Sequence, residues 1–183
     1  TATKVIVKHK TDYEAHKYQK EIHRNLKRFS VLVCHRRFGK TYLAINTLID
    51  AAVRTKRENL RFGYVAPYQK QAKQVAWDYL KRFTLNIPGV KANESESAID
   101  FPNGARIRLY GSDNGESMRG LYFDGIVADE IADFRPETWP EIIRPALTDS
   151  HHKGWCLFIG TPKGLNQFYD LYQYALKDPT WYA

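Results

Sequence analysis

One stretch decides the fold of this chain: Ser30-Val31-Leu32-Val33-Cys34-His35-Arg36-Arg37-Phe38-Gly39-Lys40-Thr41. It opens with a short apolar run of the kind that forms a buried strand, and residues 42–54 behind it carry apolar side chains at helical spacing. The segment between them matches the phosphate-binding pattern Gly-x4-Gly-Lys-Ser/Thr, except that Cys34 replaces the first glycine. The spacing therefore predicts a strand, a phosphate-binding loop and a helix in direct succession.

The end of this loop has the residue types that hold phosphate. Backbone N–H groups at a helix start point toward phosphate oxygens, and the helix dipole favours their negative charge. Gly39 lets the backbone approach closely, Lys40 is long enough to reach the β- and γ-phosphates, and the Thr41 hydroxyl is a ligand for Mg²⁺. Gly-Lys-Thr alone also fits an ordinary strand-to-helix turn. The flanking strand and helix, together with acids further along the chain, favour a nucleotide site.

Two arginines and an aromatic residue complete the loop. The middle residues of such loops are often small, so Arg36 and Arg37 are unusual there. We expect Arg36 to lean over the γ-phosphate and to take part in catalysis with Lys40; the alternative is a pair of solvated arginines. The role of Arg37 stays open, and Arg37 and Phe38 are counted with the nucleotide-binding loop.

A second apolar run, residues 125–128, ends in the acids Asp129 and Glu130. A carboxylate at the tip of a buried strand is costly unless it is paired or bound to a metal. We therefore expect Asp129 to hold Mg²⁺ through water and Glu130 to polarise the water that attacks the γ-phosphate. The alternative is a pair of N-cap acids for the following helix. An adjacent Asp-Glu pair is typical of phosphate-loop ATPases that use a glutamate as catalytic base.

The rest of the chain alternates strands with helices. Apolar patterns predict further strands at 61–66 and 155–159, a hairpin of 96–101 with 105–110, and helices at 14–29, 68–83, 138–147 and 166–176. Residues 1–10 have the pattern of a short arm or strand. Such alternation predicts an α/β domain with a central, mostly parallel sheet flanked by helices.

The composition limits the classes of function. The chain has 183 residues, 43% of them hydrophobic, which is enough for a buried core and excludes a disordered or fibrous protein. No apolar run is long enough for a transmembrane helix and no secretory leader pattern opens the chain, so we expect no membrane contact. Two widely separated cysteines indicate a reducing, intracellular setting. The net charge of +8 favours a polyanionic partner, although a lysine surplus also keeps proteins soluble.

Taken in order, the motifs resemble one family, the ATPase (motor) domain of the large terminase subunit of tailed double-stranded DNA bacteriophages. The resemblance covers nearly the whole chain. It rests on these stretches: Arg36–Thr41, Tyr64–Pro67 with Gln69 and Gln71, Gly111-Ser112 with Met118–Gly120, Ile126–Glu130, and Gly160–Gly164. Each piece is weak alone, but their order and spacing together are specific.

The resemblance implies a RecA-like phosphate-loop NTPase of the ASCE branch that binds ATP and Mg²⁺. It implies that 1–183 form a single N-terminal ATPase domain, and that the family's C-terminal nuclease domain is absent from this chain. The function implied is to couple ATP hydrolysis to the translocation of double-stranded DNA into a procapsid. The implied partners are double-stranded DNA, further copies of the chain in a ring on the capsid portal, the portal protein and the small terminase subunit, all in the host cell cytoplasm. When isolated, the domain is expected to be a monomer or weak oligomer.

The resemblance also assigns roles to two residues outside the loop and the acidic pair. Gln19 matches a position that reads the adenine edge, which a carboxamide pairs with bidentately; the alternative is an exposed glutamine on a helix face. Thr161, in Gly160-Thr161-Pro162, matches a coupling motif whose hydroxyl senses the γ-phosphate or positions the water. Its alternative is a strand-end turn held by Pro162.

Arg119 is the third residue to which the resemblance gives a role. It matches an arginine proposed to enter the active site of a neighbouring subunit, where such a finger stabilises the charge on the transferred phosphoryl group. The alternative is a local ion pair with Glu116 or Asp124.

Two other functions stay open from the sequence. A superfamily-2-like helicase or remodelling ATPase also has the upstream glutamine and the acidic pair, but it needs a second RecA-like domain to supply its arginine finger. A finger candidate placed before the acidic strand favours the packaging motor. An ATP-binding regulatory module without turnover is the third hypothesis.

Overall fold

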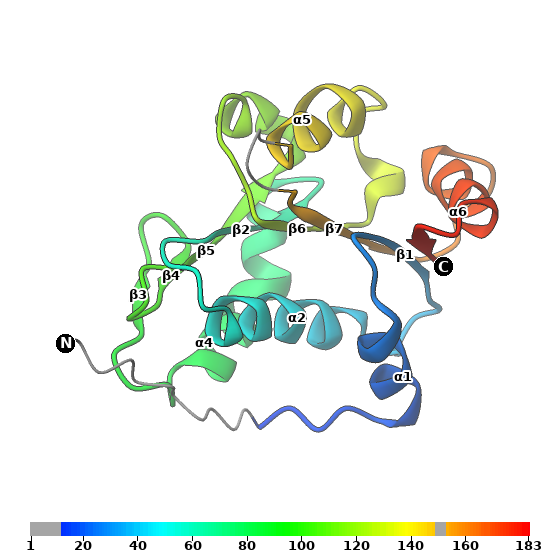
Figure 1. Cartoon of the computed structure of the whole chain (residues 1–183). Helices are drawn as coiled ribbons and strands as arrows, with labels where there is room; N and C mark the ends of the chain where they lie inside the picture. Colours follow the sequence, from blue (N-terminus) through cyan, green and yellow to red (C-terminus); the bar gives the residue numbers. More distant parts are fainter. Residues whose placement is uncertain (1–11, 149–152) are drawn as a thin grey trace.

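The computed structural model describes residues 12–148 and 153–183. In that part of the chain, one sheet has eight strands in the order β3-β4-β5-β2-β6-β7-β1-β8, and helices cover both of its faces (Figure 1). The strands are β1 (Phe29–Val33), β2 (Arg61–Ala66), β3 (Lys91–Asn93), β4 (Ala98–Asp100), β5 (Arg106–Gly111), β6 (Gly125–Asp129), β7 (Trp155–Gly160) and β8 (Trp181–Tyr182). The arm predicted at residues 1–10 lies outside the described residues.

Most of the sheet is parallel. Every neighbouring pair from β5 to β8 in the sheet order runs parallel, and only β3-β4 and β4-β5 are antiparallel. This confirms the predicted mostly parallel α/β sheet, and the predicted hairpin is the pair β4-β5. The short edge strands β3 and β8 were not predicted from the sequence. The order also inserts β7 between β1 and β6, so the phosphate-loop strand and the acidic strand are not direct neighbours.

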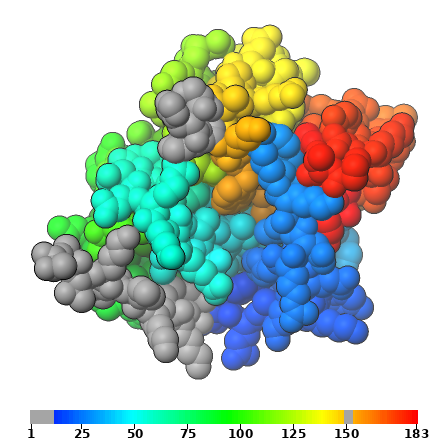
Figure 2. Space-filling view, in the orientation of Figure 1, coloured from blue at the N-terminus to red at the C-terminus, as the bar shows by residue number. Residues whose placement is uncertain are grey.

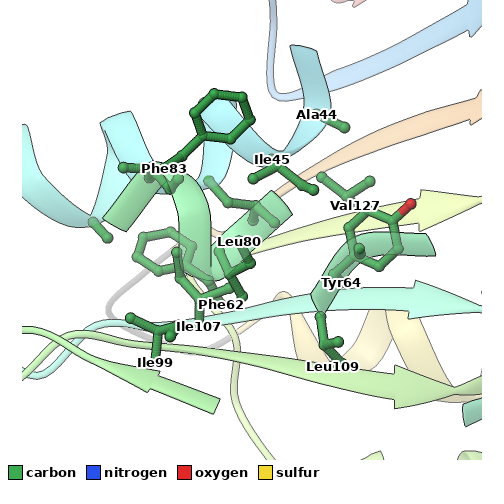
Figure 3. Packing of buried hydrophobic residues seen from close by; sticks show 14 of the residues in the cluster. Ala44, Ile45, Phe62, Tyr64, Leu80, Phe83, Ile99, Ile107, Leu109 and Val127 are labelled. Atoms are coloured by element: carbon green, nitrogen blue, oxygen red, sulfur yellow. The ribbon is translucent and has the colours of Figure 1, made fainter. Parts of the chain in front are cut away.

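One face of the sheet packs against α2 (Lys40–Arg54) and a continuous helical segment made of α3 (Gln69–Ala72), the π-helical turn η1 (Lys73–Trp77) and α4 (Asp78–Thr84). In Figure 1 these helices lie below the sheet, together with α1 (Lys17–Asn25). Because side chains alternate along a strand, every second strand residue points to this face. Figure 3 shows the resulting core, in which residues of α2 and α4 lie against strand residues that include Phe62, Tyr64, Ile99, Ile107, Leu109 and Val127.

The other face carries shorter helical segments. They are η2 (Ser112–Met118), η3 (Ile131–Asp133), η4 (Thr138–Ile143), α5 (Arg144–Ala146) and α6 (Gln167–Lys177). The alternate strand residues Val65, Ile126 and Phe158 point to this side and form a second core with them. The helix predicted at 138–147 is therefore present as η4 followed by α5, despite its two prolines.

The helix predicted at 14–29 is shorter than its apolar spacing suggested. It starts at Lys17 because the His16 side chain caps it, accepting a hydrogen bond from the Gln19 N–H at 3.4 Å. It ends before Leu26, whose ψ of 133° is extended. Phe29 instead begins β1, where it pairs with Cys156 and Trp181 of the two neighbouring strands.

The C-terminal strand β8 lies beside β1 at one edge of the sheet. Figure 2 shows the blue N-terminal segment beside the red C-terminal segment, in agreement with the pairing of β1 with β8. The Lys27 ammonium also donates to the Pro179 carbonyl at 2.6 Å. Among the described residues, no helix has the length and apolar character needed to cross a membrane.

Candidate nucleotide-binding site

Three predicted motifs meet at one edge of the sheet. The phosphate loop follows β1, the acidic pair closes β6, and Thr161 follows β7, and these three strands lie side by side and parallel. Their carboxyl ends are level, since Val33 pairs with Gly160 and Asp129 with Ile159. Open α/β sheets bind ligands at this edge, where loops and helix N-termini converge. The fold thus brings together segments separated by more than a hundred positions in the chain.

The phosphate loop joins β1 to the start of α2. The Cys34 N–H donates to the Gly160 carbonyl at 3.1 Å, so the loop leaves the sheet beside the end of β7 even though the first glycine is missing. Gly39 is the N-cap of α2 with a φ of 84°, and no side chain in the described residues caps the helix there. The N–H groups of its first turn are therefore available to an anion. A methyl group on Gly39 would lie 2.8 Å from the Gln19 amide nitrogen, so the Gln19 side chain would have to shift.

Gln19 lies against the back of this loop. Its side chain is only 4% exposed, so the alternative of an exposed glutamine on a helix face is wrong. The amide nitrogen donates to the Gly39 carbonyl at 3.3 Å and to the Phe38 carbonyl at 3.5 Å, and the amide oxygen accepts from the His16 N–H at 3.1 Å. The carboxamide therefore ties the start of α1 to the loop. Its reading of an adenine edge stays a prediction.

The two loop arginines project into solvent. Arg36 and Arg37 are both exposed, and neither has an ion-pair partner within the described ranges. Phe38 is half-buried, with its ring edge-on to His16 at 5.2 Å between centroids. This geometry leaves two unneutralised cations beside the helix N-terminus. It agrees both with phosphate contact and with the alternative of solvated arginines.

Asp129 is a buried carboxylate at the tip of β6. It is 7% exposed, and its Oδ2 accepts a hydrogen bond from the Tyr64 hydroxyl. Burial raises the pKa of the Asp129 carboxyl to about 6, helped by the Glu130 charge and opposed by the Tyr64 hydrogen bond and the Lys40 charge. Lys40 is thus close enough to act electrostatically on Asp129, so the loop and the acidic strand form a single electrostatic environment.

Glu130 has an unusual backbone. Its φ of 57° and ψ of 46° are left-handed, a conformation that costs a non-glycine residue about 1–3 kcal/mol and persists where neighbours fix it. Here the Glu130 N–H donates to the Ile159 carbonyl at 2.8 Å. Its carboxylate oxygen Oε2 accepts from the Thr161 N–H at 3.4 Å and from the Thr161 hydroxyl at 3.3 Å. Thr161 therefore contacts the acid expected to activate water, and its role at the γ-phosphate stays a prediction.

Lys163 extends this cluster. Its ammonium lies 3.6 Å from Glu130 Oε2 and 2.5 Å from Asp133 Oδ2. The hydrogen bond to Asp133, together with the charges of Asp133 and Glu130, raises the pKa of Lys163. No sequence pattern gives a role to Lys163, Asp133 or Tyr64. Lys163 and Tyr64 do lie in two of the quoted motifs, whereas nothing in the sequence pattern marked Asp133.

Arg119 lies apart from this cluster. Its side chain is 52% exposed, and its Nε is 3.0 Å from the Glu116 carboxylate. Glu116 is one of the two local partners considered for it. The other, Asp124, pairs with Arg57 at 3.1 Å and accepts from the Arg61 N–H at 2.8 Å. Within the described residues, no ion pair or hydrogen bond joins Arg119 to Glu130, and the finger role of Arg119 stays a prediction.

The oxygen ligands at this edge suit Mg²⁺. Mg²⁺ usually keeps several waters and is held by one or two carboxylates together with substrate phosphates. A hydroxyl from Thr41 and a carboxylate from Asp129 fit that pattern. In the described part of the chain, no group of three or more His, Cys, Asp or Glu residues forms an all-protein metal cage. Mg²⁺ binding by Thr41 and Asp129 stays a prediction.

Comparison with known sequences gives one family. Residues 33–182 match the family described as terminase large subunit, T4likevirus-type, N-terminal. The terminase large subunit of Escherichia phage T5 is 28% identical over 162 residues, which cover 84% of this chain and 35% of the T5 protein. The chain thus spans about a third of the length of this relative.

Solved structures share the fold. The large terminase ATPase domain of Thermus phage P74-26 superimposes with a TM-score of 0.77 at 22% identity, over 93% of this chain and 80% of that one. The large terminase of a thermophilic bacteriophage, solved in complex with ADP, has a TM-score of 0.69 at 19% identity, over 85% of this chain and 39% of that one. These similarities confirm the predicted RecA-like α/β fold.

Proposed function

Because the chain belongs to the terminase large-subunit family, matching its N-terminal part, we propose that it is an ATP-hydrolysing motor domain that couples hydrolysis to the translocation of double-stranded DNA into a procapsid. One observation carries this proposal. The open N-terminus of α2, the buried Asp129 and the Thr161-bound Glu130 lie together at the carboxyl edge of three adjacent parallel strands. The ADP complex of the thermophilic phage protein, which shares this fold, supports nucleotide binding by this chain.

Nucleotide binding is assigned to the loop. The N–H groups of the first turn of α2 would receive the phosphate oxygens, and the helix dipole adds to their attraction. Lys40 would contact the β- and γ-phosphates, and Arg36 would lie over the γ-phosphate. Thr41 and Asp129 would hold Mg²⁺, which screens the charge of the phosphates when it is bound. Gln19 supports the loop from behind through its hydrogen bonds to two loop carbonyls.

Hydrolysis is assigned to Glu130. Its carboxylate would accept a hydrogen bond from the attacking water and orient that water in line with the γ-phosphate. Thr161 holds one oxygen of that carboxylate through two hydrogen bonds, so a displacement at the γ-phosphate would be transmitted to the segment after β7. That segment continues through Lys163 into α6, which gives the motor a route from chemistry to movement.

The proposed function also includes binding partners. The net charge of +8 suits contact with the phosphates of double-stranded DNA, which needs no base reading. Arg119 would complete the site of a neighbouring copy in a ring on the capsid portal, with the portal protein and small terminase subunit as further partners in the host cytoplasm. The helicase alternative is not favoured, since the match is to terminases over most of the chain.

Phosphate release by wild type and by Glu130→Gln tests this function. We expect both proteins to bind ATP, and only wild type to release phosphate, with a rate per chain that rises with protein concentration or on adding procapsids. Unchanged turnover in Glu130→Gln would show that the assigned base is wrong. If wild type binds ATP and never releases phosphate under any of these conditions, the chain is a regulatory ATP-binding module.

A further inference from the structure

Tyr64 of β2 is a buried residue to which the proposed mechanism gives no role. It is 1% exposed, and its ring packs in the core between the sheet and α2 (Figure 3). Tyr64 pairs with Val127 across the β2-β6 ladder, so both side chains point to the same face as Asp129, two residues further along β6. The Tyr64 ring therefore extends along β6 from Val127 to Asp129, and its hydroxyl donates a hydrogen bond to the Asp129 carboxylate.

The hydroxyl of Tyr64 connects β2 to the acidic tip of β6, because it donates to Asp129 Oδ2. Burial and the neighbouring Asp129 charge raise the pKa of Tyr64 well above its usual value, so the hydroxyl keeps its proton and remains a donor. One buried hydroxyl thus contacts a carboxylate assigned to Mg²⁺.

Packing alone does not explain a tyrosine at this position. Phe62 lies on the same face of the same strand, is 2% exposed, and fills the same core without a hydroxyl. A buried hydroxyl must find a partner, so a phenylalanine would be the simpler choice for the core. The partner that Tyr64 finds is Asp129, a side chain of the nucleotide site. The hydroxyl is therefore better explained by its effect on this carboxylate.

We propose that Tyr64 is a positioning residue of the nucleotide site, whose hydroxyl orients Asp129 toward the divalent cation of a metal–nucleoside triphosphate. The inference rests on the proposed function. A hydrogen bond to one carboxylate oxygen fixes the rotation of the Asp129 side chain before any cation arrives. Partners that orient ligands in this way typically change metal affinity or activity by about 10–100-fold when they are removed.

The variant Tyr64→Phe tests the inference because it removes only the hydroxyl. The measurement is the Mg²⁺ concentration that gives half-maximal binding of ATPγS, with binding in EDTA and the melting temperature of the free protein as companion readings. We expect the Mg²⁺ midpoint to rise by about 10–100-fold while binding in EDTA stays at the wild-type level. Tyr110→Phe is the matched control, because Tyr110 is a buried tyrosine in the second core; its midpoint should equal that of wild type.

The possible outcomes separate the two proposals. A wild-type Mg²⁺ midpoint in Tyr64→Phe would overturn the role of Tyr64 and leave the proposed function intact. Wild type that binds no ATPγS at any Mg²⁺ concentration would overturn both. If Tyr64→Phe does not fold, Asp129→Asn is compared with Asp129→Asn combined with Tyr64→Phe. The inference then requires that the added substitution change the Mg²⁺ midpoint by less than about twofold. The effects of substitutions at contacting residues that act as one unit are not additive. A further change of tenfold or more would overturn it.

Discussion

The carboxyl edge around Asp129 and the loop around Arg119 hold charged residues in opposite ways. Asp129 is 7% exposed, and Glu130 beside it is bound by Thr161 and by Lys163. Arg119 is 52% exposed and pairs with a single exposed carboxylate, Glu116. A charge fixed by buried hydrogen bonds is already in position for chemistry, whereas a charge in a surface pair exchanges partners at low cost. One chain therefore contains the residues assigned to nucleotide binding, and the proposed finger role of Arg119 requires another copy.

The largest expected effect tests the role of the exposed Arg119. Arg119→Ala should bind ATP like wild type and lose stimulated turnover by about 10³–10⁵-fold, the range known for arginine fingers. Phosphate release in the presence of procapsids is the measurement. Mixing Arg119→Ala with Glu130→Gln should restore activity, because each subunit would supply what its neighbour lacks. Without rescue, Arg119 acts within its own chain or has no catalytic role.

The next largest effect tests the nucleotide-binding loop. Lys40→Ala should weaken ATP binding by at least about a hundredfold, or roughly 3 kcal/mol, because the phosphates lose their main side-chain cation. Equilibrium binding of a fluorescent ATP analogue measures it. Lys56→Ala, an exposed lysine after α2, should bind as wild type does. Retained nanomolar-to-micromolar binding in Lys40→Ala would contradict the assignment of the loop.

A stability effect should follow from the burial of Asp129. Its pKa in the folded protein is about 6, above the value near 4 of an unfolded chain. The folded state therefore binds this proton more tightly, so the stability of the free protein falls as pH rises from about 4 to about 6 and stays lower above that range.

Asp129→Asn removes this titration. At pH 7 the free variant should melt above wild type, by the equivalent of up to roughly 3 kcal/mol, and the difference should vanish near pH 4. Thermal melting across pH measures it, with the exposed Asp113→Asn as control. If Asp129→Asn melts below wild type at pH 7, the carboxylate stabilises the free fold and its burial carries no penalty.

The smallest effect concerns Lys163. Its pairs with Glu130 and Asp133 are partly exposed, and such pairs contribute about 0–1 kcal/mol. Lys163→Ala should lower the melting temperature slightly and change single-turnover hydrolysis only a few-fold, since Thr161 still holds Glu130. Lys177→Ala, an exposed lysine of α6, is the matched control. A loss of turnover as large as that expected for Glu130→Gln would mean that Lys163 belongs to the catalytic machinery.

Much of the site could be predicted because its signals are local. The loop 34–41 and the acids 129–130 were predicted from short patterns joined to a strand, and the structure places them at one sheet edge as expected. Thr161 needed a resemblance to known proteins, because a threonine after a strand has no strong pattern of its own. Prediction failed where contacts link distant positions. The burial of Gln19, the pair between Lys163 and Asp133, and the hydroxyl of Tyr64 at Asp129 had no local signal.

The sequence by itself determined the strand–loop–helix unit, the acidic strand and the alternation that makes a mostly parallel sheet, because periodicity and spacing act over a few residues. Tertiary packing alone set the place of β7 between β1 and β6, the hydrogen bonds of Gln19 to the loop, and the hydrogen bond of Tyr64 to Asp129. These contacts depend on which strands become neighbours and on their register. Both are set by the packing of the whole core, which no single segment encodes.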